Sequence, residues 1–361
     1  MQFQSGPLSR APFTIIMAVL MLFTTVALSP PMTVTAAVPA AAPAPHSGTT
    51  LQNGSATPAP QPAPHPAGAT VAPLALGVTG PWDVGARMDA TAQLLGATPK
   101  IEEVYQDWAH QGFLAPNMDA IVARGATPVL SWEPEDYTKE PNPQPNYTYA
   151  KIISGTYDAY IHQFARDTKA WNKKLYLKFA AEMNIQVYPW GVNNPGSGNT
   201  SAQFVTMWRH VHDIFTHESV TNVVWVWCPN VIITPSVPFK DVYPGDSYVD
   251  WVGLDGYNWG TLRIGWQTFG QVFGESYNGL LALTSKPIMI CEIGANESGG
   301  SKAQWITQTF LTDIPTHYPR IRAVIWFDEV METDWRFNSS ASSLAAFKSV
   351  AQNPLYGGRL P

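Results

Sequence analysis

Between Leu74 and the C-terminus, short apolar runs alternate with longer stretches in which apolar positions recur every three or four residues. The short runs are rich in β-branched and aromatic residues and predict strands, whereas the longer stretches predict amphipathic helices. The predicted strands are Leu74–Thr79, Lys100–Tyr105, Thr127–Trp132, Leu175–Ala181, Asn222–Trp227, Tyr248–Leu254, Pro287–Glu292 and Ile321–Trp326.

The clearest helical patterns cover Tyr157–Trp171, Gln203–Phe215 and Ala303–Ile314, the last with Ser301 as a candidate N-cap. Strands that alternate with helices indicate a parallel sheet. Eight of them in one folded domain fit a closed (β/α)8 TIM barrel. An open, doubly wound sheet is the alternative, but no glycine-rich phosphate-binding motif follows any predicted strand.

The N-terminal part of the chain has a different pattern, with no charged residue between Arg10 and Asp83. An apolar run at residues 11–28, followed by small residues, predicts a signal peptide over residues 1–37. An uncleaved membrane anchor is the alternative, because the run is close to spanning length. Residues 38–73 are rich in Pro and Ala and predict a disordered linker. The folded domain is therefore expected at residues 74–361, in a secreted protein.

Composition and charge exclude several classes of protein. The chain has 21 basic and 27 acidic residues, so it has no basic field for nucleic acid. Its two cysteines, Cys228 and Cys291, are too few for a disulfide framework and are predicted to point outward under the helices. The eight histidines show no metal-ligand spacing. We expect no cofactor or metal, no membrane partner beyond the possible N-terminal anchor, and a monomer.

Candidate chemistry gathers at the carboxyl ends of the predicted strands, which is where TIM barrels place their active sites. Indole faces stack on the C–H faces of sugar rings, while carboxylates and amides bond hydroxyl groups, so this combination predicts a polysaccharide partner. Trp132 is either cleft wall or core, and Asn230 either positions a ligand or satisfies loop backbone. The strand-end residues include Trp82, Asp83, Asp107, Trp108, Trp132, Glu133, Glu182, Trp227, Asn230, Asp255, Tyr257, Glu292, Trp326, Asp328 and Glu329.

Two glutamates stand at the ends of strongly apolar strands, Glu182 after KLYLKFAA and Glu292 after KPIMIC. Strict alternation puts Glu182 on one face with Lys178, and Glu292 on one face with Ile288 and Ile290. A single strand-end glutamate is usually solvated or salt-bridged. Two of them, on the fourth and seventh strands of one barrel, can face each other across its mouth, as retaining glycoside hydrolysis requires.

Several motifs in this order resemble glycoside hydrolase family 26: KFAAEMN, VYPWG, VVWVWCPN, VDWVGLDGYN, PIMICEIG and DWRFNSS. The resemblance implies a (β/α)8 barrel and a retaining mechanism. Glu182 matches the family's acid/base and Glu292 its nucleophile. Tyr257 matches a tyrosine that hydrogen-bonds the nucleophile, Trp190 a sugar-contacting tryptophan, and Trp326 a stacking platform.

Two positions depart from the family pattern. Ala181 stands where the family usually has His, and Lys178 where it commonly has Arg. The expected function is an endo-β-glycanase that acts on β-1,4-mannan first, with β-glucan or xylan next. The alternative is a non-catalytic carbohydrate-binding protein on a decayed glycosidase barrel.

Overall fold

The computed structural model describes residues 72–80, 84–110, 112–139 and 143–361. The predicted signal peptide, nearly all of the predicted linker, and the strand-end residues Trp82 and Asp83 lie outside these ranges. Among the helices that the structure does describe, none is long and apolar enough to cross a membrane.

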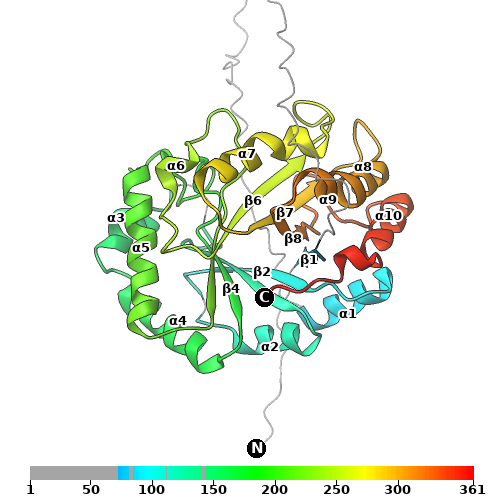
Figure 1. The fold of residues 1–361 in the computed structure, drawn as a ribbon. Helices are drawn as coiled ribbons and strands as arrows, with labels where there is room; N and C mark the ends of the chain where they lie inside the picture. The colour runs from blue at the N-terminus through cyan, green and yellow to red at the C-terminus, as the bar shows by residue number, and fades with distance from the viewer. Residues whose placement is uncertain (1–71, 81–83, 111, 140–142) are drawn as a thin grey trace, which may run out of the picture. The chain divides into compact units, whose positions relative to one another are not determined.

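Eight parallel strands form a closed barrel in the described part of the chain, in the order β1 to β8 with β8 pairing back to β1 (Figure 1). The (β/α)8 prediction is confirmed, and each predicted strand overlaps an observed one. The strands are β1 (Ala75–Thr79), β2 (Ile101–Asp107), β3 (Thr127–Glu133), β4 (Leu175–Phe179), β5 (Val223–Trp227), β6 (Trp251–Asn258), β7 (Ile288–Ala295) and β8 (Ile321–Trp326).

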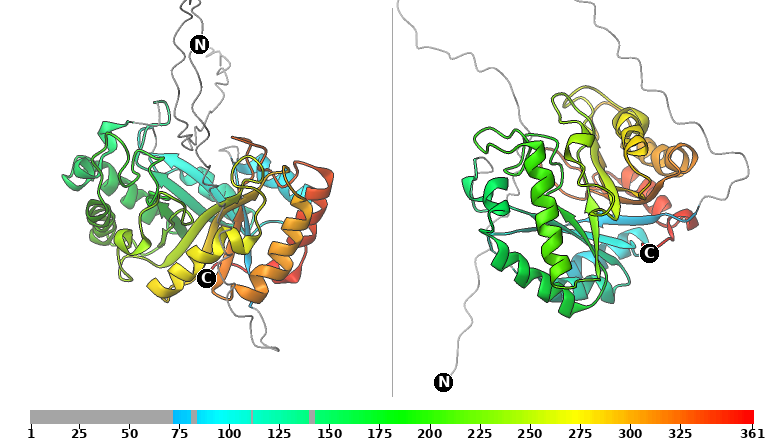
Figure 2. Two further views of the ribbon diagram at one scale, coloured as in Figure 1. Left: turned by 90° about the horizontal axis from the view of Figure 1, so that it is seen from above. Right: turned by 60° about the vertical axis from the view of Figure 1, so that its left-hand side comes forward.

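Helices surround the strands on their outer side (Figure 2). Their apolar faces and the outward side chains of the strands form one large core. The α-helices are α1 (Val84–Leu95), α2 (Ala115–Ala123), α3 (Tyr149–Ile153), α4 (Asp158–Trp171), α5 (Ser201–His217), α6 (Phe239–Val242), α7 (Phe269–Leu283), α8 (Lys302–Gln308), α9 (Ile314–His317) and α10 (Ala341–Ala351). Three short elements are the 3-10 helices η1 (Pro145–Tyr147) and η3 (Pro354–Tyr356), and the π-helical turn η2 (Thr309–Asp313).

Side-chain caps start several of the helices as their sequences predict. The Ser301 hydroxyl accepts a hydrogen bond from the Gln304 backbone N–H at the start of α8, which confirms the predicted cap. Thr200 and Thr268 form complete capping boxes at the starts of α5 and α7. The predicted helix Ala303–Ile314 is instead divided, because η2 separates α8 from α9.

A second apolar cluster fills the barrel interior and is built from alternate strand residues such as Val129, Tyr176 and Met289. The C-terminus closes one end of this interior. Leu360 belongs to the cluster, and the Tyr176 hydroxyl donates to the Pro361 backbone oxygen. The carboxyl ends of the strands are at the other end, which leaves the site at one mouth only.

A β-bulge interrupts the regular alternation of side chains in β7. Leu254 pairs with Ile290 and Asp255 pairs with Glu292, so Cys291 is an extra residue. Cys291 and Glu292 therefore both turn toward the barrel interior, and Glu292 does not share a face with Ile290. The prediction that Cys228 and Cys291 point outward is wrong, because both belong to the interior cluster, where they are free thiols.

Candidate active site

Glu292 is held at the barrel mouth by three donors. The Tyr105 hydroxyl donates to its Oε1 at 2.9 Å, the Tyr257 hydroxyl donates to Oε2, and the Lys178 ammonium lies 2.7 Å from Oε1. Hydrogen bonds with a charged partner are short and strong, and they fix the orientation of the carboxylate. Both oxygens are thereby fixed, and the carboxylate is suited to act as a nucleophile.

Lys178 lies at the centre of a buried group of acidic side chains that includes Glu292. Its ammonium is 2.6 Å from Glu103 Oε1 and 3.6 Å from Asp255 Oδ2, and its side chain is fully buried. Burial disfavours the charged ammonium, but the charges of Asp255, Glu103 and Glu292 hold the pKa of Lys178 well above its usual value. Burial also raises the pKa of Glu103, to about 8. The single ammonium group of Lys178 therefore stays charged and faces three carboxyl groups, those of Glu103, Asp255 and Glu292.

Glu182 lies just beyond β4, which ends two residues earlier than its pattern predicts. The chain turns there through positive φ angles at Ala180 (43°) and Glu182 (54°), a conformation that costs energy in residues other than glycine. The Tyr188 hydroxyl donates to Oε2 of Glu182, and the Asn230 amide donates to Oε1. The turn and the two donors direct this carboxyl into the mouth.

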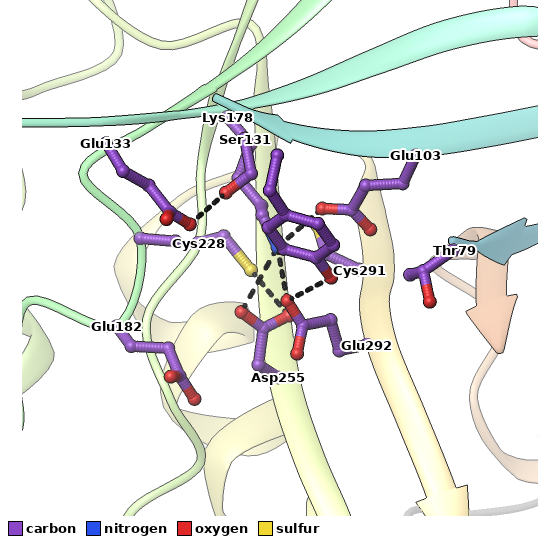
Figure 3. A network of polar contacts seen from close by, with 12 residues as sticks. Thr79, Glu103, Ser131, Glu133, Lys178, Glu182, Cys228, Asp255, Cys291 and Glu292 are labelled. Atoms are coloured by element: carbon purple, nitrogen blue, oxygen red, sulfur yellow. Dashed lines mark hydrogen bonds and ion pairs between the residues drawn. The ribbon is translucent and has the colours of Figure 1, made fainter. Parts of the chain in front are cut away.

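Burial, and after it the charge of Glu292, raise the pKa of Glu182 to about 7, although the hydrogen bonds from Tyr188 and Asn230 oppose the shift. A carboxyl that keeps its proton near neutral pH is suited to be a general acid. Figure 3 shows Glu182 and Glu292 on opposite sides of the same space, below Lys178 in that view. The two carboxyl groups have different surroundings and are suited to different chemical roles.

Glu133, at the end of β3, adds a third carboxyl group near the first two (Figure 3). It accepts hydrogen bonds from the Ser131 hydroxyl at 2.9 Å and from the Tyr137 hydroxyl. Burial raises its pKa to about 7 against these hydrogen bonds. The charges of Lys178 and Glu292 both act on this carboxyl group, which therefore belongs to the same electrostatic cluster.

An aromatic collar surrounds the Glu292 side of the mouth. It is a small cluster that is separate from the main core and includes both tyrosines that bond Glu292. Trp335 is central to this cluster, since the centroid of its ring lies 4.8 Å from the ring centroids of both Tyr257 and Trp259. The collar consists of Tyr257, Phe327 and Trp335, which are buried, and of Tyr105, Trp259 and Met331, which are partly exposed.

A model of the family described as Glycosyl hydrolase family 26 matches residues 138–336, which is more than half of the chain. The chain belongs to glycosyl hydrolase family 26. The match spans β4 to β8 and therefore includes both glutamates and most of the collar.

The relatives of this chain have different names, and the chain aligns with different fractions of their length. Endoglucanase H from Acetivibrio thermocellus is 38% identical over 258 residues, which are 69% of this chain and 27% of that protein. A mannan endo-1,4-beta-mannosidase from Bacillus subtilis is 29% identical over 153 residues, or 41% of this chain and 37% of the relative. The chain thus matches well under half the length of either protein.

Solved structures agree with the fold. Bacillus subtilis mannanase BCman superposes with a TM-score of 0.58 at 19% identity, over 77% of this chain and 86% of that one. The catalytic domain of a Bacillus sp. JAMB-750 GH26 endo-beta-1,4-mannanase superposes with a TM-score of 0.61 at 16% identity, over 78% of this chain and 86% of that one. At these identities the similarity shows that the barrel fold is shared.

Two tryptophans predicted to bind substrate lie in the core instead. Trp326 is fully buried against Phe310 and Phe347, and its indole N–H donates to the Trp335 backbone oxygen. Trp132 is also fully buried, stacks on Phe164, and donates to the Tyr160 hydroxyl. The stacking role predicted for Trp326 is therefore wrong, and of the two alternatives for Trp132 the structure shows the core, because these side chains point from their strands toward the helices. Trp335, from the DWRFNSS motif, occupies the mouth instead.

The other predicted binding residues take different positions around the site. Tyr257 bonds Glu292 and Asn230 bonds Glu182, so both contact the predicted catalytic pair. Trp190 is buried, stacks on Tyr188 at 4.6 Å, and donates to the Ala181 backbone oxygen. Trp190 therefore supports Tyr188, and it is Tyr188 that contacts Glu182.

Tyr105, Tyr188 and Lys178 are partners of the glutamates that reasoning on single strands missed. Tyr105 and Lys178 lie within strands, where their patterns are those of ordinary buried positions. Tyr188 is in the VYPWG segment, where the resemblance assigns a sugar contact to the tryptophan and no role to the tyrosine. The available signal was a buried lysine in an apolar strand, since such a lysine needs acidic partners.

One interior group in the described chain has metal-ligand character. The side-chain ligand atoms of Cys228, Asp255 and Cys291 all lie within 4.8 Å of one another. The Cys228 thiol lies 3.2 Å from Asp255 Oδ1, and the Lys178 ammonium faces the other oxygen of Asp255. The lysine supplies positive charge to this carboxylate, which fits a proton-bearing polar cluster better than a cation site.

Proposed function

We propose that this chain is a retaining endo-β-glycanase, with Glu182 as acid/base and Glu292 as nucleophile. The observation that carries the proposal is the difference between the two carboxyl groups. Glu182 has a pKa raised to about 7, whereas Glu292 receives two hydroxyl hydrogen bonds and an ammonium contact. Double displacement needs one carboxyl group that gives up a proton and a second that is positioned to attack, and these contacts position Glu292.

The residues perform the proposed reaction in two steps. Protonated Glu182 gives its proton to the oxygen of the departing sugar while Glu292 attacks the anomeric carbon, which breaks the glycosidic bond and forms a glycosyl-enzyme ester. Ionised Glu182 then takes a proton from water, and the resulting attack at the anomeric carbon releases Glu292. Tyr188 and Asn230 hold Glu182 through both steps.

β-1,4-Mannan is the first proposed substrate, since mannan endo-1,4-beta-mannosidases are among the relatives. β-Glucan is the second, on a specific observation. Next to Glu182 the chain has Ala181, which is buried and offers no polar side chain, and Lys178 is directed to Glu292 and Glu103. Endoglucanase H is also the relative with 38% identity.

Reducing-sugar release from a panel of mannan, β-glucan and xylan tests the activity and identifies the polymer. Wild type is expected to act on at least one polymer, Glu292→Ala to lose turnover but keep binding, and Glu275→Gln, on the exposed face of α7, to match wild type. A protein that binds a polymer but cleaves none supports the non-catalytic alternative. Retained turnover in Glu292→Ala contradicts the assignment of the nucleophile.

Export is also part of the proposal, supported by the apolar run and small residues within positions 1–37. A monomeric state is proposed with it. N-terminal sequencing of the mature protein is expected to find a new start close to residue 38. An intact N-terminus in the membrane fraction would instead indicate the anchor. Light scattering of the folded domain checks the monomer.

A further inference from the structure

Trp259 follows β6 directly and forms the outer, partly exposed edge of the aromatic collar. Its ring stands at 89° to Trp335, and Trp335 contacts Tyr257, which bonds Glu292. A short chain of rings thus leads from the proposed nucleophile to Trp259. An indole placed this way can receive the C–H face of a sugar bound beside Glu292.

The backbone around Trp259 is firmly held. The Asn296 side-chain amide donates to the Trp259 carbonyl oxygen, and Asn258 Oδ1 accepts from the backbone N–H groups of Gly260 and Gln267. A Cβ on Gly260, whose φ is 53°, would lie 1.8 Å from the Ser298 carbonyl oxygen. The ring therefore projects from a fixed position.

Arg263 covers the ring. Its guanidinium carbon lies 3.6 Å from the centroid of Trp259, close enough for a cation–π contact. In the described part of the chain, the Arg263 side chain makes no hydrogen bond or ion pair, and the residue is exposed. The carboxylates of Glu332 and Glu182 lie close enough to act on its charge. The guanidinium end of this otherwise exposed residue is partly buried, and this burial is the larger effect and lowers the pKa of Arg263.

A sugar ring and a guanidinium compete for the same indole face. The tryptophan is held by its contact with Trp335, whose ring centroid lies 4.8 Å away at an interplanar angle of 89°. The arginine, in contrast, lies at the exposed end of a turn closed by the Gly260–Gly265 bridge, beside the exposed residues Leu262 and Ile264. Water can solvate the guanidinium once it leaves the ring.

We propose that Trp259 is a sugar-stacking platform of the cleft and that Arg263 occupies it in the free protein, so that the glycan must displace the guanidinium to bind. The inference rests on the proposed glycanase function and adds a binding determinant to it. Arg263 is off the ring in both the bound ground state and the transition state, so it opposes binding without affecting the chemical step.

The test measures KM and kcat for Arg263→Ala, Arg263→Lys and Trp259→Ala on the most rapidly cleaved polymer. An exposed cation–π contact is worth about 0.5–1 kcal/mol, which converts to a fall in KM of about two- to five-fold for Arg263→Ala with kcat unchanged. Arg263→Lys is expected between Ala and wild type. Trp259→Ala is expected to raise KM. Lys173→Ala, which removes a cation–π contact with Trp171 on α4, is the matched control and should match wild type.

A raised KM in Arg263→Ala overturns the proposal, because it makes Arg263 a ligand of the sugar. An unchanged KM overturns it too, as does a Trp259→Ala variant that binds as well as wild type. Affinity electrophoresis of the same variants in gels that contain each polymer separates this inference from the catalytic proposal. If no polymer is cleaved, tighter binding by Arg263→Ala still supports the platform, whereas equal migration of all variants refutes it.

Discussion

Single residues set the chemistry of this site through their immediate partners. Glu182 and Glu292 are the same residue type, yet one accepts bonds from Tyr188 and Asn230 in a buried turn, and the other contacts a fully buried ammonium. Burial and the charge of Glu292 raise the pKa of Glu182, which therefore holds a proton, while two hydroxyl groups and the ammonium orient the carboxylate of Glu292. The proposed roles of the two glutamates follow from this difference.

Removal of the Glu182 carboxyl tests its role through pH dependence. The pKa of Glu182 is raised to about 7, so wild-type kcat/KM is expected to fall as pH rises through about 7 and the acid ionises. Glu182→Gln is expected to lose about 10²–10⁴-fold in kcat on polymer and to lose this alkaline limb. Initial rates of sugar release between about pH 5 and about pH 9 measure both. An unchanged alkaline limb would assign the titration to another group.

Lys178 carries a second prediction, on stability. Lys178→Met leaves buried carboxylates without their cation and is expected to cost about 3–5 kcal/mol in the free energy of unfolding at about pH 9, where these groups are ionised. The cost should shrink as pH falls below about 8, the pKa of Glu103, since a protonated carboxyl needs no counter-charge. Urea unfolding measures it. Lys173→Met, which breaks an exposed pair with Asp119, is the control and should cost about 1 kcal/mol or less.

At the scale of elements, β4 and β7 place the two glutamates by departing from regular geometry. β4 ends at Phe179 and turns through positive φ angles, while β7 gains an extra residue at Cys291. Bulges near active sites redirect side chains in this way. In β7 the bulge brings the Cys291 thiol and the Glu292 carboxylate to the same side, so sulfur atoms pack directly beneath the acids.

Gly253 in β6 tests how tightly these strands pack. A Cβ there would lie 2.5 Å from the Cys291 sulfur and 2.7 Å from the Cys228 sulfur. Gly253→Ala is therefore expected to cost about 1–3 kcal/mol by overpacking. In a Cys228→Ala/Cys291→Ala background the same substitution should cost less, because the sulfur atoms are gone. Urea unfolding of all four proteins gives the coupling energy between Gly253→Ala and the two cysteine substitutions. An equal cost of Gly253→Ala in both backgrounds would contradict close packing of Gly253 against the sulfur atoms.

At the scale of the whole molecule, several carboxyl groups at the mouth of the barrel have raised pKa values and keep their protons to higher pH than usual. Burial raises the pKa of Glu103 to about 8, of Glu133, Glu182 and Glu329 to about 7, and of Asp328 to about 6. These acids surround one opening, and their desolvation works against the stability of the domain. The fold tolerates this cost because the large outer core and the interior cluster stabilise the barrel independently of the mouth.

Stability should therefore decrease as pH rises. Between about pH 4.5 and about pH 8 the folded protein binds more protons than the unfolded chain, so the free energy of unfolding falls with increasing pH across this window. The urea midpoint is expected to be higher near pH 5 than near pH 8. Glu133→Gln should flatten the dependence, while Glu275→Gln leaves it unchanged. A midpoint that rises over this window would contradict the raised pKa values.

The linear pattern of the chain determined the elements and their order. Apolar runs alternating with amphipathic stretches predicted all eight strands, because strand and helix formation depend on periodicities visible in sequence. The ends of the fourth and seventh strands predicted that Glu182 and Glu292 reach the same mouth, and the structure brings both there. These predictions needed only local patterns and one rule of topology.

Only the tertiary structure decided which way strand-end side chains point. Trp326 and Trp132 face the helices while Trp335 and Trp259 reach the mouth, and sequence composition does not distinguish between these indoles. The bulge at Cys291 reverses alternation at the residue that matters most, Glu292. A shift of one residue moves a side chain to the other face of a sheet, and that register is set by the neighbouring strands of the closed barrel.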